Sequence, residues 1–377
     1  MKIAICAPNQ SSSSETFIAN HVNRLNGEIY FLYNGWLPTM YNGNPILHAH
    51  RKTISARIIR IIKRLRKKKE GVSDVAVAFE GFLKRHKIDV VLAEYGTTGA
   101  AIGPICKKNG IPFVVHFHGF DAYHHETLKS NSQNYKKMFK SAAAVVAVSE
   151  HMKNQLVSLG CPENKIELIY YGVDTELFRA LKKKQFHKTF ISVGRFVPKK
   201  APQLTILAFS KIIRDFPDAR LIMAGDGGLG NNHELWIACK QMASAIGVES
   251  NVTFTGAIPH DEVSRLMKES DVFLQHSVRS ETGDSEGTPN SVIEASGSGL
   301  CVVATKHAGI PDVIVHNETG FLCKELDVPQ MAEYMKECLR NPEKTIQMGK
   351  SGAERIIKNF DLSIQLDKLL YVLKSAV

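Results

Sequence analysis

The stretch SEGTPNSVIEASGSGLCVVA, residues 285–304, places a loop, a helix start and an apolar strand in direct succession. Gly287 and Pro289 punctuate the loop, and Thr288 or Asn290 can cap the helix that follows. Elements in this order are typical of an α/β domain. Because the backbone amides at a helix start point outward, a phosphate or a sugar hydroxyl can bind at this loop.

Two carboxylates, Glu286 and Glu294, stand eight positions apart around this loop and helix start. The loop carries Glu286 above the helix, and Glu294 falls on the second helical turn. One carboxylate can therefore reach a sugar while the other hydrogen-bonds a second set of hydroxyls. The alternative interpretation is a capped helix with an exposed glutamate.

Apolar runs of strand type alternate with helical patterns along the whole chain. A first series covers 2–7, 28–33, 90–93, 113–116 and 144–148, and a second covers 189–193, 220–224, 252–254, 272–275 and 300–304. This alternation predicts two α/β domains with parallel sheets covered by helices, as does the length of 377 residues.

The predicted linker is the Lys-rich segment 176–188. The expected domains are therefore 1–180 and 181–360. A terminal helical segment, 361–377, is expected to pack back on the first domain.

The formal charge of +11 requires an anionic partner: nucleic acid, a membrane surface or a phosphorylated substrate. Ten Lys and Arg residues and no acid lie within 51–69, with apolar residues at helical spacing among them. Such a helix suits an anionic membrane surface, although a solvated basic helix and a nucleic-acid site are alternatives. The residues expected at the membrane are Arg57, Arg60, Lys63, Arg64, Lys67 and Lys68.

The sequence predicts a cytoplasmic protein. No segment approaches the roughly 20 apolar residues of a membrane span, and the N-terminus reads as a strand rather than a signal peptide. The seven cysteines are scattered singly, which argues against a disulfide framework and a zinc cluster.

The run VGRFVPKK, residues 193–200, places cations directly after a predicted strand. An Arg195 fork and a Lys200 ammonium can clamp a diphosphate and stabilise it as a leaving group. Lys199 competes with its neighbour for this role. A solvated basic loop is the alternative to any binding role.

Two short runs at strand and helix ends stand out in the first domain. HFHGFD, residues 116–121, sets His116 and His118 on one face of a strand, with Asp121 following. Two histidines and an aspartate can suggest a metal site, but no further ligand cluster is evident and no metal is expected. His116 suits a core histidine. SETFI, residues 14–18, begins a helix, and simple capping by its serine is as good an interpretation as a binding role.

The E-x7-E spacing, followed by glycines 297 and 299, GIPD at 309–312 and GFL at 320–322, resembles the retaining family-four glycosyltransferases of the GT-B fold. The resemblance implies two facing Rossmann-like domains and a C-terminal helix that crosses back to the first. It implies a nucleoside-diphosphate sugar, either a UDP- or a GDP-sugar, as the donor. No metal ion and no cofactor are expected.

Site roles follow from this resemblance. Glu294 is expected to grip the nucleotide ribose, and Glu286 to contact the donor sugar. Arg195 and Lys200 are expected to bind the pyrophosphate. His118, in the family's H-G-x-D motif, is expected near the donor sugar's hydroxyls. Further donor-binding residues are Gly225, Ile258, Gly287, Thr288, Pro289 and Asn290. A departure from the family is Ala201, where a glycine is usual.

Three runs resemble a subgroup that builds exopolysaccharides: SETFI at 14–18, GDSEGTP at 283–289 and HAGIP at 307–311. This resemblance implies a glycan acceptor, lipid-linked and met at the inner face of the membrane. The expected acceptor-side residues are Ser14, Glu15 and Asp121.

Two other functions remain open. A nucleotide-sugar epimerase of the same fold would release free product without an acceptor. A basic nucleic-acid-binding protein with a degenerate sugar site would bind RNA or DNA with strong salt dependence and would bind no nucleotide sugar. A nucleic-acid partner is not expected.

Overall fold

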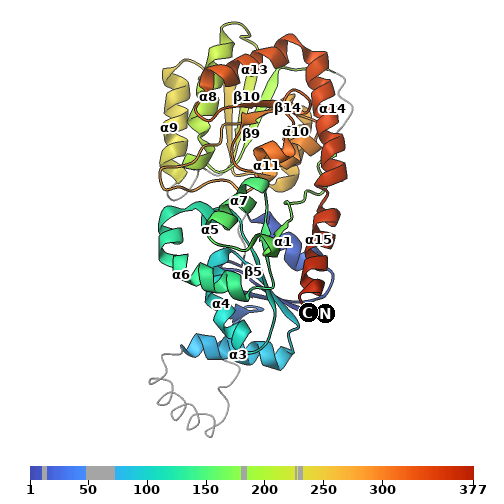
Figure 1. Ribbon diagram of the computed structural model, residues 1–377. Coiled ribbons are helices and arrows are strands. Elements are labelled where there is room, and N and C mark those ends of the chain that lie inside the picture. The colour runs from blue at the N-terminus through green and yellow to red at the C-terminus, as the bar shows by residue number, and fades with distance from the viewer. Residues whose placement is uncertain (11–14, 48–72, 180–184, 226, 228–231) are drawn as a thin grey trace. The chain divides into compact units, whose positions relative to one another are not determined.

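The computed structural model describes residues 1–10, 15–47, 73–179, 185–225, 227 and 232–377 (Figure 1). Contacts divide these residues into two compact units. The first unit comprises Met1–Val148, Lys153–Ile169 and Leu366–Val377, and the second comprises Ser149–Met152 and Tyr170–Gln365. The basic stretch, with the six cations that the sequence predicted at a membrane, lies outside the described residues.

The first unit is built on an eight-stranded sheet in the order β4-β3-β2-β1-β5-β6-β7-β8. Its strands are β1 (Lys2–Cys6), β2 (Glu28–Tyr33), β3 (Met40–Tyr41), β4 (Asn44–Pro45), β5 (Val90–Glu94), β6 (Phe113–His116), β7 (Ala144–Ala147) and β8 (Ile166–Leu168). The six longer strands are parallel, and five of them were predicted, whereas β8 was not. The short β3 and β4 pair antiparallel at one edge, which the sequence did not predict.

Helices cover the faces of this sheet (Figure 1). They are α1 (Thr16–Arg24), α3 (Asp74–His86), α4 (Gly96–Lys108), α5 (Phe120–Tyr123), α6 (His125–Ser141) and α7 (Glu150–Ser158). The central strand β5 is buried along its whole length because helices lie on both faces of a parallel sheet.

The second unit is built on a six-stranded sheet in the order β11-β10-β9-β12-β13-β14, parallel throughout. Its strands are β9 (Thr189–Val193), β10 (Arg220–Ala224), β11 (Val252–Gly256), β12 (Val272–Gln275), β13 (Cys301–Thr305) and β14 (Gly320–Cys323). Its helices are α8 (Pro202–Ile213), α9 (Asn232–Ala245), α10 (His260–Glu269), α11 (Asn290–Gly297), α12 (Ile310–Val313), α13 (Val328–Arg340) and α14 (Pro342–Asn359). Two α/β units with parallel sheets are the predicted fold class.

The last helix, α15 (Leu362–Ser375), begins in the second unit, and its residues from Leu366 onward belong to the first. This agrees with the predicted return of the terminal helix to the first domain. No helix in the described ranges is both long and apolar enough to cross a bilayer. All seven cysteines are buried free thiols, as the sequence predicted.

The predicted caps of two helices need correction. The N-cap of α11 is Pro289, and no side chain caps this helix, so neither Thr288 nor Asn290 is its cap. Pro289 holds an extended conformation that turns the loop into the helix, which makes Asn290 the first helical residue. The N-cap of α1 is Glu15, again without a side-chain cap, and Ser14 lies outside the described residues.

Candidate functional site

Three loops leave the neighbouring strands β9, β10 and β11 and are hydrogen-bonded to one another. The Gly194 amide donates to the Ala224 carbonyl at 2.9 Å, and the Gly225 amide donates to the Gly256 carbonyl at 3.0 Å. Gly225 has φ +150°, and a Cβ there would lie 1.9 Å from the Gly194 carbonyl oxygen. Only glycine permits this approach, so Gly225 acts through its backbone.

A small pocket at the end of β9 is lined by Gly194, Arg195, Lys200 and Gln275, among others. The Lys200 stem lies against Gly194, since a Cβ at that glycine would come within 2.6 Å of Lys200 Cδ. The loop therefore brings the two predicted cations to one pocket. Ala201, which follows, has φ +38°, a conformation that favours glycine, in keeping with the residue usual in similar proteins.

Lys200 forms an ion pair with Glu286, with 3.0 Å between Nζ and Oε1. Burial alone would raise the pKa of Glu286, but Lys200, and next Lys199, lower it to about 2. Lys199 has other partners: its Nζ lies 3.1 Å from Asp284 Oδ1 and 3.2 Å from the Ser285 carbonyl oxygen. The two adjacent lysines thus pair with different carboxylates, and Lys200 is the one beside Glu286.

His307 supports the loop that carries Glu286. The Glu286 amide donates to His307 Nε2 at 3.2 Å, and the Ser285 hydroxyl lies 3.0 Å from the same nitrogen. On the other side of the ring, Nδ1 donates to Glu325 Oε1 at 2.7 Å. Burial opposes ionisation of Glu325, but the hydrogen bonds from His307 and the Arg279 amide lower its pKa. The motif HAGIP pointed to His307, whereas no local pattern pointed to Glu325.

Glu294 is paired with His260, with 3.0 Å between Oε1 and the imidazole Nε2. This hydrogen bond raises the pKa of His260, against the effect of burial. The His260 ring also packs edge-on against Phe178, with centroids 5.0 Å apart. His260 was missed from the sequence, although it begins α10 two residues after the predicted Ile258.

The remaining loop residues predicted for the donor are buried around the start of α11. The Gly309 amide donates to the Gly287 carbonyl at 2.9 Å, and Thr288 and Pro289 are buried beside it. The helix is tied to the Arg195 pocket because the Ser291 hydroxyl donates to Gln275 Oε1 at 2.9 Å. Lys200 therefore contacts Glu286 directly and shares a pocket with Arg195, and Ser291, on the same helix as Glu294, is hydrogen-bonded to Gln275 of that pocket.

A buried carboxylate surrounded by histidines lies at the end of β5 in the first unit. Glu94 accepts from His21 Nδ1 at 2.7 Å and from His118 Nε2 at 2.8 Å, and His116 Nδ1 lies 3.6 Å away. Burial would raise the pKa of Glu94, but His21 and His118 lower it. Glu94 and His21 were missed from the sequence because they lie 73 positions apart.

Asp121, which the sequence predicted on the acceptor side, lies among backbone amides. Its carboxylate is fully buried and accepts from the backbone amides of Gly96, His118 and Gly119 at 2.7, 3.0 and 3.1 Å. Such a carboxylate holds a turn together. The ring of His118 is itself 2% exposed and stacks on Phe17, with centroids 4.2 Å apart.

Among the described residues, His21, Glu94 and His116 could hold a metal ion, since their ligand atoms lie within 4.8 Å of one another. This set differs from the His116, His118 and Asp121 set considered from the sequence. Two imidazole donors already satisfy Glu94, so histidine–carboxylate pairing accounts for the cluster.

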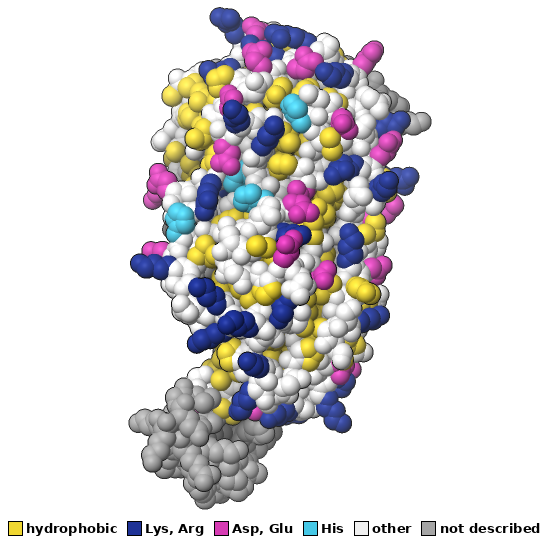
Figure 2. All heavy atoms as spheres, in the orientation of Figure 1, with side chains coloured by type: hydrophobic (Ala, Val, Ile, Leu, Met, Phe, Trp, Pro, Cys, Tyr) yellow, Lys and Arg dark blue, Asp and Glu magenta, His cyan; other side chains and the backbone are white. Residues whose placement is uncertain are grey.

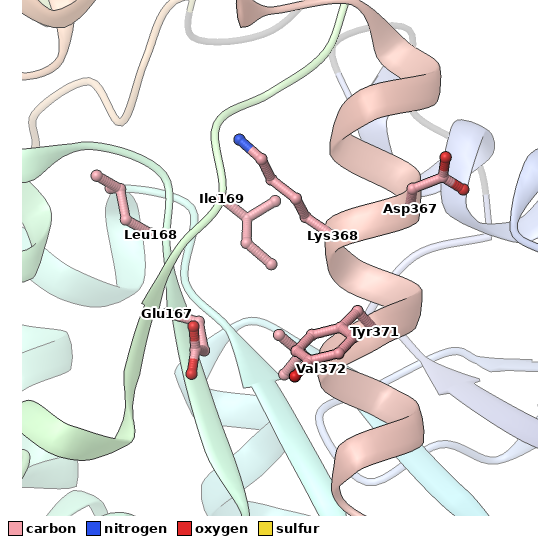
Figure 3. Close-up of a pocket in the computed structure, with 7 residues that line it drawn as sticks. All are labelled: Glu167, Leu168, Ile169, Asp367, Lys368, Tyr371 and Val372. Carbon is pink, nitrogen blue, oxygen red and sulfur yellow. The ribbon is translucent and has the colours of Figure 1, made fainter.

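A separate cavity of about 330 Å³ lies between β8 and the C-terminal half of α15 in the first unit. Figure 3 shows Lys368 and Tyr371 of the helix opposite Glu167 and Ile169 of the strand side. None of the predicted site residues lines this cavity.

Two α/β units, each built on a sheet of mainly parallel strands, are the architecture of the GT-B class. Residues 173–355 match the family described as Glycosyl transferases group 1, and residues 18–177 match Glycosyltransferase Family 4. Together the two matches span most of the chain. The protein therefore belongs to the group 1 glycosyltransferases, with an N-terminal domain of family 4.

The chain is similar to proteins with known or assigned roles. The amylovoran biosynthesis glycosyltransferase AmsK of Erwinia amylovora is 26% identical over 293 residues, which are 76% of this chain and 70% of AmsK. A GDP-mannose-dependent alpha-(1-6)-phosphatidylinositol monomannoside mannosyltransferase of Mycolicibacterium smegmatis is 26% identical over 301 residues, 76% of each chain. HepE of Anabaena, solved in complex with UDP, shares the fold with a TM-score of 0.81, 17% identity and 100% coverage of both chains.

Proposed function

We propose that this glycosyltransferase moves a hexose from a nucleoside-diphosphate sugar to a hydroxyl of a glycan acceptor and retains the anomeric configuration. The ion pair of Lys200 with Glu286, beside Arg195 at the end of β9, is the observation that carries the proposal. Cations at a strand end suit a diphosphate, and a carboxylate next to them suits sugar hydroxyls.

In the proposed reaction, the acceptor hydroxyl forms a bond to the anomeric carbon as the bond to the diphosphate oxygen breaks on the same face. Arg195 and Lys200 stabilise the negative charge that develops on the leaving diphosphate. The departing phosphate oxygen takes the hydroxyl proton. No carboxylate nucleophile is required, in contrast to retaining glycosidases, and neither a metal ion nor a cofactor takes part.

Glu294 is proposed to bind the nucleotide ribose, with His260 holding its carboxylate in place. Because HepE binds UDP and the mycobacterial relative depends on GDP-mannose, both nucleotides are candidates for the donor. The Ile258 loop and the start of α11 are proposed to line the donor pocket. His118 is proposed to act close to the donor sugar's hydroxyls.

The proposed setting is cell-surface polysaccharide synthesis at the cytoplasmic face of the membrane. The name of AmsK supports the glycan product. The helix α6 supports an anionic surface as partner, since it carries four exposed lysines against one glutamate. Figure 2 shows Lys and Arg side chains gathered over the lower part of the first unit, near α4 and α6. The lysines of α6 are Lys129, Lys136, Lys137 and Lys140.

Thermal unfolding in the presence of UDP- and GDP-sugars tests the donor. A donor that binds the native state raises the free energy of unfolding by about 2.7 kcal/mol at a concentration of 100 Kd, and Tm rises with it. The stabilising sugar is then incubated with and without a lipid-linked glycan. Transfer that requires the glycan supports the proposal, whereas a free sugar product from donor alone points to an epimerase. Tight salt-dependent RNA binding without any donor shift would replace the proposal altogether.

A further inference from the structure

Side chains that the proposed reaction does not use gather where β1, β2 and β5 end, next to one another in the sheet. The loops after β1 and β2 are joined because the Gly35 amide donates to the Pro8 carbonyl at 2.9 Å. Asn9, Trp36 and Tyr95 follow these three strands. Ligands of parallel α/β sheets bind at this edge, beyond the carboxyl ends of the strands.

An indole ring is exposed at this edge. Trp36 is 42% exposed, which is unusual for a tryptophan that packs against another aromatic ring. Its ring meets the Tyr95 ring edge-on, with centroids 6.1 Å apart and planes at 71°. This contact fixes the indole while leaving much of its surface open.

A carboxylate is held beside these rings. Glu15 occupies the N-cap of α1, but its side chain makes no capping hydrogen bond. It accepts instead from the Tyr95 hydroxyl at 2.7 Å and lies 3.4 Å from Asn9 Nδ2. The carboxylate is thereby turned toward the loops and away from the helix amides that an N-cap residue ordinarily serves.

The residue that joins the indole to the carboxylate has an unusual backbone. Tyr95 has φ +76° and ψ 140°, a conformation that favours glycine and that bulky residues rarely adopt. Such backbone strain is concentrated at functional sites, where the surrounding structure holds it. Here it lets one tyrosine contact both Trp36 and Glu15.

We infer that Trp36, Glu15 and Asn9 form a subsite for a neutral sugar ring of the acceptor glycan, which rests on the proposed function. A pyranose has an apolar face that packs on an exposed indole, and hydroxyls that donate to a carboxylate. The side-chain amide of Asn9 adds a donor and an acceptor. Because Glu15 repels anions, the subsite discriminates against sugars that carry a carboxylate or a phosphate.

Fluorescence tests the subsite directly, because the chain has only two tryptophans, Trp36 and Trp236. Trp236→Phe leaves Trp36 as the sole indole reporter. This variant is titrated with the methyl pyranosides of mannose, glucose and galactose, and with methyl glucuronide as the acidic probe. We expect a saturable change in emission with at least one neutral glycoside at millimolar concentration, and about tenfold weaker binding of the glucuronide.

Two further variants in the same background locate the carboxylate. Glu15→Gln weakens the neutral glycoside about fivefold and narrows the difference from the glucuronide, because the amide repels no anion. Tyr95→Phe keeps the ring and removes only the hydroxyl that orients Glu15, so it weakens binding less. Absence of a saturable response to every neutral glycoside, or equal affinity for the glucuronide, overturns the inference.

Kinetics separate the inference from the proposed function. Trp36→Ala raises the KM for the glycan acceptor about tenfold or more, and the KM for the donor stays unchanged. Trp36→Phe brings the acceptor KM most of the way back to the wild-type value. An unchanged acceptor KM in Trp36→Ala contradicts the subsite while the transferase activity stands. If the proposed function is wrong, the wild-type protein itself turns over no nucleotide sugar, which is a different result.

Discussion

Lys200 Nζ lies 3.0 Å from Glu286 Oε1, and both side chains are largely buried at the end of the second sheet. The pair joins the only two predicted site residues of opposite charge that the described structure brings into direct contact. In the proposed reaction, a donor diphosphate beside Arg195 is a second anionic partner for Lys200. The pair is therefore both a structural element and the proposed centre of donor binding.

Variants of this pair are expected to change the stability of the protein and its turnover independently. Lys200→Ala leaves the buried Glu286 charge without its cation and destabilises the protein by roughly 3 kcal/mol. The double variant Lys200→Ala with Glu286→Gln removes both charges, so it regains most of this stability but not the turnover. Denaturant unfolding and donor turnover of the three proteins measure the two effects. If the double variant is as active as wild type, the pair has no role in the reaction.

Acid stability follows from the same pair. The pKa of Glu286 is about 2 in the folded protein, below its ordinary value of 4.5, so its ionised form stabilises the fold. This contribution is present above about pH 4.5 and is lost as the pH falls toward 2, and its size is about 3 kcal/mol. Glu286→Gln is expected to flatten the fall in Tm over that window. An unaltered acid profile in this variant contradicts the depressed pKa.

The pair of His260 with Glu294 predicts a raised histidine pKa. The hydrogen bond to Glu294 stabilises the imidazolium, so the folded pKa lies above 6.5. The associated stability is present below pH 6.5 and is lost as the pH rises through the folded pKa. NMR titration of His260 is expected to show this shift, and Glu294→Gln to reverse it. If the pKa of His260 is the same in Glu294→Gln as in the wild type, the pair does not form.

The histidine cluster around Glu94 predicts a large stability effect in the first unit. Glu94→Ala removes the acceptor of both imidazole hydrogen bonds and leaves a cavity, at an expected cost of about 3–5 kcal/mol. Glu80→Ala is the control, because its carboxylate is partly exposed on α3 and pairs with two exposed lysines, Lys84 and Lys108. Urea unfolding compares the two, and equal losses would show that the cluster adds no stability.

The strands and the cations that follow them were predictable because their signals are local. Apolar runs mark buried parallel strands, and Arg195 and Lys200 come directly after one of them. The choice between Lys199 and Lys200 was not predictable, since adjacent lysines differ only in which carboxylate the fold brings to each. Asp284 pairs with Lys199, and Glu286 pairs with Lys200.

Partners from distant parts of the chain escaped prediction for the same reason. Glu94 and His21 meet only because β5 lies beside β1 in the sheet, and no spacing in the sequence records that neighbourhood. The strands β3 and β4 have two residues each, too few for an alternating pattern. The burial of the Asp121 carboxylate among backbone amides was not predicted, because a motif names a residue without showing its surroundings.

The most direct test measures the rate at which the Arg195→Ala variant releases nucleoside diphosphate from the sugar donor. Arg195 is exposed at the donor pocket, so its removal leaves the fold intact. Arg214→Ala is the matched control, since that side chain is 95% exposed on the same unit. We expect a loss of about 100-fold or more in kcat/KM for Arg195→Ala and wild-type turnover for Arg214→Ala. Equal turnover by the two variants would contradict the placement of the diphosphate at this loop.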